Sequence, residues 1–116
     1  MKIAINKCYG GFHLSPLAEK LIAERKGIRI VFKNGFTGDE VSFEDVIKSW
    51  RVGVYSNLED LKRNDPDLIA VIEEIGQKAN TPVSDICIVE IPDDVEWVVE
   101  EYDGVEWISE KHRVWR

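Results

Sequence analysis

The chain has 116 residues, enough for one domain of ordinary size and too few for two. Its composition, with 44% hydrophobic and 32% charged residues, is typical of a globular protein and excludes an intrinsically disordered chain. No apolar run approaches the roughly 18 residues that span a bilayer, and Lys7 interrupts the first apolar stretch before a signal-peptide core could form. We therefore expect a single domain over residues 1–116, located in the cytoplasm and without a membrane partner.

The net charge of -7 makes nucleic acid an unlikely partner, because nucleic-acid binding depends on neutralising phosphates. Residues 1–34 contain seven Lys or Arg against two Glu, a net charge of +5, so the rest of the chain carries -12. The extreme is the segment 90–110, which has nine acidic residues and no Lys or Arg. This segment predicts either a solvated acidic surface or a surface for a basic partner, including a mimic of DNA.

The first third of the chain predicts a strand, a helix and a second strand. An apolar run places a strand covered on both faces at residues 2–7. Ser15-Pro16 is a helix-start pattern and predicts a helix over 16–26. Alternating apolar residues predict a strand over 28–33, so the chain should begin with a right-handed βαβ unit.

The centre of the chain gives weaker signals. A turn at Asn34-Gly35 leads into a loop that we expect to be exposed as far as Glu40. Ser42 and Asp45 have the spacing of a capping box and predict a short helix through Trp50.

Two clearer elements follow. Asp65-Pro66 repeats the helix-start pattern, and an apolar stripe predicts a helix over 66–78. Residues 86–89 are apolar at both odd and even positions, so both faces of a strand here would be apolar, which predicts a central strand.

The end of the chain predicts a β-hairpin. Residues 95–102 and 105–111 flank Asp103-Gly104, a pair that tolerates the positive φ angles of a two-residue turn. Pairing across this turn puts six residues on one face: Val98, Glu100, Tyr102, Val105, Trp107 and Ser109.

On the other face of the hairpin, Glu101 lies opposite Glu106. Either solvent surrounds this like-charged pair, or a cation such as Arg113, Arg116 or a metal ion lies between its members. Together the elements predict an α/β (α+β) protein with a mixed sheet of about five strands, a βαβ start, flanking helices and a C-terminal antiparallel hairpin.

The loop from Lys7 to Ser15 is the strongest candidate for a binding site. It leaves a buried strand and enters a helix, which is where α/β proteins hold ligands. Gly10 and Gly11 allow backbone amides of residues 10–14 to converge on an anion. The loop matches neither dinucleotide nor phosphate-loop spacing, and a simple tight turn is the alternative interpretation.

A catalytic alternative makes Cys8 a nucleophile, activated by His13 or His112, with glycine amides stabilising an oxyanion. A lone cysteine on a strand is more often a small core residue, so the protein is expected not to be an enzyme. No metal site or cofactor is predicted, because the possible ligands come from four distant places. These ligands are Cys8, His13, Cys87 and His112.

Distinctive segments lie at the two ends of the chain: KIAINKCYGGF at 2–12, with Leu14-Ser15, and IPDDVEW, EEYDG and EKHR between 91 and 113. In these segments the chain resembles a family of small proteins encoded by bacteriophages and prophages. Asp65-Pro66-Asp67-Leu68 adds to the resemblance, whereas His13 replaces a glycine expected there. The resemblance implies a phage protein in the cytoplasm of its host, and small phage accessory proteins often counter host defence.

We therefore expect a non-enzymatic binding protein for a small anionic, nucleotide-derived ligand, possessing a homo-oligomeric interface that deepens the site. Such a protein could sequester a nucleotide signal of the host. The alternatives are an acidic interaction protein that binds a host protein through the hairpin over 90–110, and a Cys8-dependent enzyme. The predicted ligand-binding residues are Lys7, Cys8, Tyr9, Gly10, Gly11, Phe12, His13, Ser15, Tyr102, Trp107, His112 and Arg113.

Overall fold

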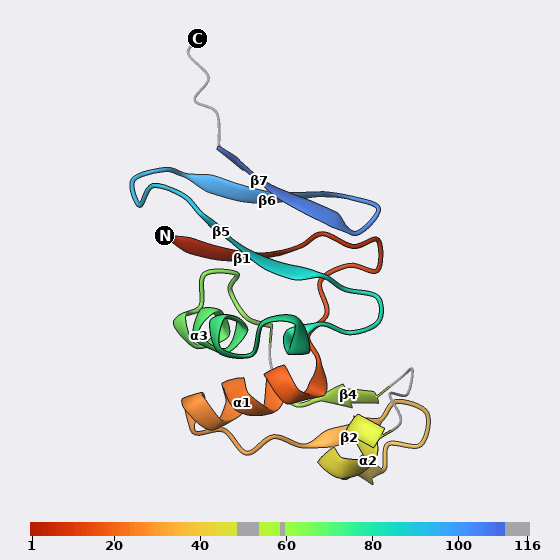
Figure 1. The fold of residues 1–116 in the computed structure, drawn as a ribbon. Coiled ribbons are helices and arrows are strands. Elements are labelled where there is room, and N and C mark those ends of the chain that lie inside the picture. Colours follow the sequence, from red (N-terminus) through yellow and green to blue (C-terminus); the bar gives the residue numbers. More distant parts are fainter. Residues whose placement is uncertain (49–53, 59, 111–116) are drawn as a thin grey trace.

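The computed structural model describes residues 1–48, 54–58 and 60–110. Within these ranges the helices are α1 (Pro16–Lys26), α2 (Phe43–Lys48) and α3 (Pro66–Ile75), followed by the 3-10 turn η1 (Gly76–Ala79). The strands are β1 (Lys2–Asn6), β2 (Phe32–Asn34), β3 (Glu40–Val41), β4 (Val54–Ser56), β5 (Ile86–Glu90), β6 (Trp97–Tyr102) and β7 (Val105–Glu110). The α+β class predicted from the sequence is confirmed (Figure 1).

The two long helices begin where the sequence predicts, because the predicted caps form. Ser15 Oγ accepts a hydrogen bond from the amide of Ala18 at 3.1 Å. Asp65 caps α3 by accepting from the amides of Asp67 and Leu68 at 2.9 and 3.1 Å. The predicted bounds of α1 are confirmed, whereas α3 ends at Ile75 and continues as the tighter η1.

The strands pair differently from the prediction. β1 pairs antiparallel with β5, from Lys2 opposite Glu90 to Asn6 opposite Ile86. β2 pairs with β3 and β4 in a separate small sheet. The predicted βαβ unit and five-stranded mixed sheet are therefore replaced by three small antiparallel sheets among the described residues. The physical reason is that α1 lies between β1 and β2, so these strands cannot share hydrogen bonds (Figure 1).

α1, α3 and η1 pack on one face of the β1–β5 ladder. Nine buried residues form the core cluster between them: Ala4, Ala18, Ile22, Leu68, Ile69, Val71, Ile72, Ala79 and Ile86. Ile3 and Ile5, at the opposite parity of β1, are buried as well. The ladder is therefore covered on both faces, as the unbroken apolar run predicts.

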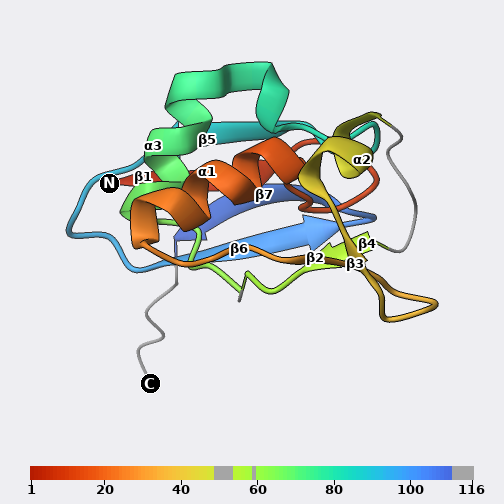
Figure 2. The ribbon, with the colours of Figure 1, turned by 90° about the horizontal axis from the view of Figure 1, so that it is seen from below.

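The C-terminal hairpin covers the other face of the β1–β5 ladder. Its register is the predicted one, with Tyr102 opposite Val105 and Glu100 opposite Trp107. Asp103 and Gly104 have φ angles of 54° and 88°, as a two-residue turn requires. Figures 1 and 2 show the hairpin on the side of β1 and β5 that lies away from α3.

The central segment is confirmed in part. Ser42 Oγ accepts from the amide of Asp45 at 3.2 Å and opens α2, as predicted. The predicted end of this helix at Trp50 lies outside the described residues. Glu40, expected in a loop, starts β3 and pairs with Lys33. In the part of the chain that the structure describes, no helix has the length and apolar character needed to cross a bilayer.

Candidate functional site

Both ends of the predicted binding loop are fixed to the segment before β5. The Lys7 amide donates to the carbonyl oxygen of Asp85 at 2.8 Å, which extends the β1–β5 pairing by one residue. At the other end the Ser15 amide donates to the carbonyl oxygen of Ala79 at 2.8 Å. The Ser15 hydroxyl donates to the carbonyl oxygen of Lys78 at 2.7 Å. The loop therefore has little freedom to open at its ends.

Asn6, which sequence reasoning missed, ties this loop to the hairpin. Its fully buried side chain donates to the carbonyl oxygens of Cys8 and Gly104 at 2.6 and 2.7 Å. Its Oδ1 accepts from the amide of Asp85 at 2.8 Å and from that of Cys8 at 3.3 Å. A buried asparagine with all its bonding groups used is stabilising, because each unpaired group would carry a desolvation penalty. The sequence signal that could have identified Asn6 is its position as a polar residue at the end of an apolar strand.

Glycines in the loop and in the hairpin turn permit close backbone contacts. A Cβ atom on Gly10 would lie 2.0 Å from the carbonyl oxygen of Val83. A Cβ atom on Gly104 would lie 2.3 Å from the carbonyl oxygen of Tyr9. The hairpin turn thus packs directly on the loop, and the glycines have a structural role in this contact.

Loop amides divide into those with partners and those without. The amides of Lys7, Cys8, Gly11 and Ser15 each donate to an acceptor in the protein, that of Gly11 at a long 3.4 Å. The amides of Tyr9, Gly10, Phe12, His13 and Leu14 have no acceptor among the described residues. Only the second group is available to an external ligand.

An ion pair missed from the sequence joins the hairpin to the rest of the protein. Arg63 donates two hydrogen bonds to the carboxylate of Glu106, at 2.5 and 2.8 Å. Glu106 is 8% exposed and also accepts from the amide of Asn6 at 2.8 Å. The Arg63 guanidinium lies 3.7 Å from the centre of the Phe12 ring.

The Arg63–Glu106 ion pair explains why Glu106 tolerates its position opposite Glu101. The cation is Arg63, from a segment whose sequence pattern was weak, while Arg113 and Arg116 lie outside the described residues. The backbone carbonyl oxygen of Arg63 also accepts a hydrogen bond from the Ala4 amide at 2.8 Å. One residue therefore covers the free edge of β1 and neutralises a buried acid.

The opposite side of the hairpin is exposed. We call this the outer hairpin face, and it comprises Val98, Glu100, Tyr102, Val105, Trp107 and Ser109. Tyr102 is 77% exposed, Trp107 43% and Val98 38%. Glu100 Oε2 accepts from Trp107 Nε1 at 3.0 Å and from Ser109 Oγ at 2.7 Å. Its Oε1 has no donor within the described ranges.

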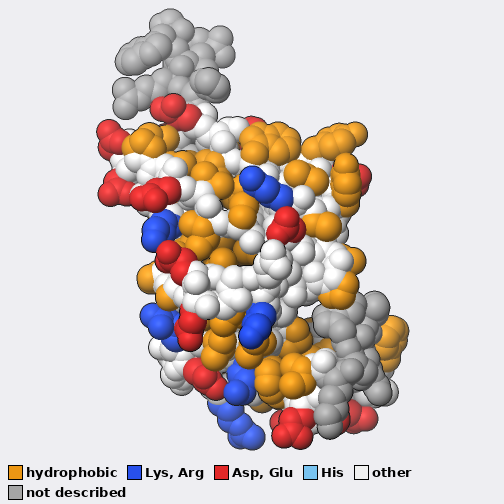
Figure 3. Space-filling model, in the orientation of Figure 1, with side chains coloured by type: hydrophobic (Ala, Val, Ile, Leu, Met, Phe, Trp, Pro, Cys, Tyr) orange, Lys and Arg blue, Asp and Glu red, His pale blue; other side chains and the backbone are white. Residues whose placement is uncertain are grey.

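Most acidic residues of the segment 90–110 are exposed and unpaired. Asp93 forms an ion pair with the N-terminal ammonium group, which lowers the pKa of its carboxyl through a direct hydrogen bond. Six others make no ion pair with a described residue: Glu90, Asp94, Glu96, Glu101, Asp103 and Glu110. Figure 3 shows acidic and hydrophobic side chains together over the part of the molecule where β6 and β7 lie.

The structure brings some predicted ligand-binding residues together and separates others. Tyr9 and Gly11 pack against Gly104 of the hairpin turn, and Gly10 packs on Val83. Phe12 contacts Arg63, which pairs with Glu106 of the hairpin. Tyr102 and Trp107 belong to the outer hairpin face, and Tyr9 is 74% exposed. His112 and Arg113 lie outside the described residues.

The catalytic alternative gains no support from the cysteines. Cys8 and Cys87 are free and half-buried, and burial raises the pKa of the Cys87 thiol. No described histidine donates to or accepts from Cys8. His13 accepts a hydrogen bond through its backbone carbonyl oxygen, from Ser84 Oγ at 2.7 Å. Over the described part of the chain, no three His, Cys, Asp or Glu side chains converge as metal ligands would.

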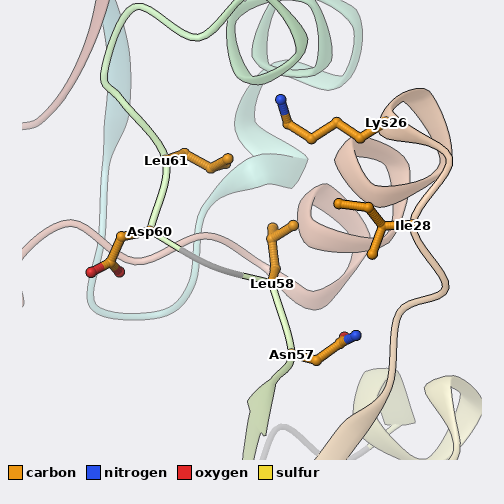
Figure 4. Close-up of a pocket in the computed structure, with 6 residues that line it drawn as sticks. All are labelled: Lys26, Ile28, Asn57, Leu58, Asp60 and Leu61. Carbon is orange, nitrogen blue, oxygen red and sulfur yellow. The ribbon is translucent and has the colours of Figure 1, made fainter.

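A shallow pocket of about 400 Å³ lies away from both the loop and the hairpin. Its lining residues are Lys26, Ile28, Asn57, Leu58, Asp60 and Leu61. Figure 4 shows Leu58, Leu61 and Ile28 turned toward one another, whereas Asp60 points away. The Lys26 ammonium is paired with Asp65 at 2.7 Å, so it offers little charge to a ligand.

Comparisons with protein-family models, with curated proteins and with solved structures give no match for this chain. The resemblance to phage proteins thus stays a prediction based on residues at the two ends of the sequence.

Proposed function

We propose that the protein is a non-enzymatic binding protein that docks on a cationic surface of another protein through the outer hairpin face. The observation that carries the proposal is the arrangement around Glu100. Its carboxylate is held in place by Trp107 and Ser109, and one oxygen remains available to a cation. If the chain is a phage protein, as the resemblance implies, the partner is a host protein.

The composition of the face suits protein recognition. Aromatic residues contribute much of the binding energy of protein interfaces, and Tyr102 and Trp107 are both exposed here. A carboxylate already fixed by two hydrogen bonds loses less conformational entropy when a partner binds it. The surrounding acidic residues would speed association with a cationic partner and repel an anionic one.

The experiment is an NMR titration with two synthetic nine-residue peptides, one of alternating Arg and Ala and one of alternating Glu and Ala. We expect the arginine peptide to shift amide signals of residues 96–110 and the glutamate peptide to shift none. The key variant is Glu100→Lys. Its control is Asp39→Lys, which changes the net charge equally at an exposed position outside the hairpin.

The proposal requires the first variant to lose the shifts and the second to keep them. Equal losses in the two variants would mean that only the overall charge matters. Shifts confined to residues outside 96–110 would equally contradict the proposal.

A second candidate function is binding of a small anionic, nucleotide-derived ligand at the loop from Lys7 to Ser15. It is supported by the five loop amides without an acceptor among the described residues and by the exposed side chain of Lys7. Sequestering a host nucleotide signal would be its biological use. A homo-oligomer that deepens the site belongs to this hypothesis.

Adenosine diphosphate is a suitable probe for this candidate, with thermal unfolding as the measurement. Lys7→Ala should abolish ligand-induced stabilisation, and Lys33→Ala, at another exposed lysine, should not. Gly10→Asp is unsuitable as a test, because its side chain would collide with Val83 in the absence of any ligand. Sedimentation with and without the nucleotide would test the oligomer.

A further inference from the structure

One edge of the hairpin is an open strand edge. β6 pairs with β7 along six residues, from Trp97 opposite Glu110 to Tyr102 opposite Val105. Among the described residues no strand pairs with the other edge of β6. An unpaired edge presents a row of backbone donors and acceptors that can template an added strand.

The register identifies the backbone groups on this edge. In a two-residue hairpin the residues that flank the turn, Tyr102 and Val105, form a hydrogen-bonded pair. Alternation then directs the amides and carbonyls of Trp97, Val99 and Glu101 away from β7. None of these groups bonds to a residue elsewhere in the described ranges.

Charge decides which kind of strand fits. Glu96, Glu100, Glu101 and Asp103 are all exposed along or beside this edge. A second copy of β6 would bring like charges together, which disfavours pairing between copies. A strand that carries positive charge would instead be attracted by these carboxylates.

We propose that β6 accepts an extended peptide segment of a partner protein as an additional strand, with two consecutive cationic residues opposite Glu100 and Glu101. The inference rests on the proposed function and specifies how the partner binds. Successive side chains of a strand point to opposite faces, so one cation reaches Glu100 on the outer hairpin face and the next reaches Glu101 on the other. Apolar β-branched residues on one side of this pair would lie beside Val98 and Val99.

The test uses a ten-residue fluorescent peptide with Arg-Arg at its centre and alternating Val and Thr on both sides. Two methylated versions form the matched pair: one carries N-methyl groups on the odd residues and the other on the even residues. Methylation blocks only the strand edge to which the modified amides point. We expect one version to bind at least about tenfold more weakly and the other to bind as the parent does.

Variants of Glu101 provide a second measurement. Glu101→Gln removes the charge and keeps the outward amide, whereas Glu101→Pro removes both while sparing the ladder with β7. The proline variant should bind the peptide several-fold more weakly than the glutamine variant. The methylated peptides are measured on the unmodified protein, so this part of the test does not depend on the folding of a variant.

The outcomes separate this inference from the proposed function. If both methylated peptides bind equally well, strand addition is overturned. In that case loss of binding in Trp107→Ala and in Glu100→Lys would still support docking on the outer hairpin face. If these two variants bind the peptide normally, the proposed function fails as well.

Discussion

Glu106 and Glu100 belong to the same hairpin and have opposite surroundings. Glu106 is buried, accepts two hydrogen bonds from Arg63, and connects the hairpin to β1 through the amide of Asn6. Glu100 is exposed, and its carboxylate is fixed by Trp107 within the hairpin itself. The acidic segment 90–110 thus contains two kinds of carboxylate, one that stabilises the fold and one that is available to a partner.

The difference follows from strand parity. Residues 100 and 106 point to opposite faces because a two-residue turn pairs 100 with 107 and 101 with 106. One face covers β1 and β5, and the other meets solvent. Substitutions on the face that covers β1 and β5 should therefore mainly lower stability. Substitutions on the outer hairpin face should mainly weaken binding.

Breaking the ion pair should have the largest effect on stability. Arg63→Ala leaves the buried carboxylate of Glu106 without its cation and removes the contact with Phe12. We expect a loss of about 3 kcal/mol in the free energy of unfolding, measured by urea denaturation. The double variant Arg63→Met/Glu106→Gln should recover part of this loss because it removes both charges. A single variant as stable as the parent protein would contradict the role assigned to the pair.

Gly104→Ala tests the attachment of the hairpin turn to the loop. The added methyl group would lie 2.3 Å from the carbonyl oxygen of Tyr9, at a residue whose φ angle is already positive. The unfolding free energy should fall by about 2 kcal/mol. Gly38→Ala is the control, because Gly38 has a similar φ of 75° and no atom within 4 Å of the added group. It should cost about 1 kcal/mol, and equal losses would show that the contact with Tyr9 is unimportant.

A substitution outside the hairpin should lower stability without altering either face of the hairpin. Asp65→Ala removes the N-cap of α3 and should cost about 1 kcal/mol at neutral pH. Calorimetry would measure the loss. Binding of the arginine peptide should not change, and weaker binding would imply that stability alone governs the outer hairpin face.

The same residue gives a pH dependence of known sign. Burial would raise the pKa of the Asp65 carboxyl, but hydrogen bonds from Lys26 and from the amides of Leu68 and Asp67 outweigh it and lower the pKa. A carboxyl with a lowered folded-state pKa stabilises the fold above its unfolded pKa, near 4, and loses this effect as pH falls through the folded pKa. The stability difference between the parent protein and Asp65→Ala should therefore narrow below about pH 4. A constant difference down to pH 2 would refute the assignment.

The smallest stability effect is expected on the outer hairpin face. Glu100→Gln keeps a side-chain acceptor for Trp107 and Ser109 and should change the unfolding free energy by less than about 0.5 kcal/mol. Thermal unfolding would measure it. A loss above 1 kcal/mol would place Glu100 with Glu106 as a residue that stabilises the fold.

Local features of the fold could be predicted from the sequence because they depend on neighbouring residues. Ser15-Pro16 and Asp65-Pro66 begin helices through their own side chains, and Asp103-Gly104 sets the register of the hairpin. Strand order was not predictable in this way. The pairing of β1 with β5 depends on how α1 packs, which the residues of β1 do not encode.

The candidate site was predicted in part for the same reason. Tyr102 and Trp107 could be placed on one face by parity, and the structure exposes both. Arg63 could not be found, because it contacts Glu106 from a segment without helical or strand periodicity. Gly10 had two interpretations from the sequence, and its contact with Val83 supports the structural one.

The most direct measurement compares Glu100→Gln and Glu106→Gln in one binding experiment with the fluorescent Arg-Arg peptide. Both substitutions remove one negative charge from the same hairpin, so overall electrostatics are matched. We expect weaker binding by Glu100→Gln and unchanged binding by the folded fraction of Glu106→Gln. Equal affinities for the two variants, or a loss confined to Glu106→Gln, would contradict the assignment of the outer hairpin face as the binding surface.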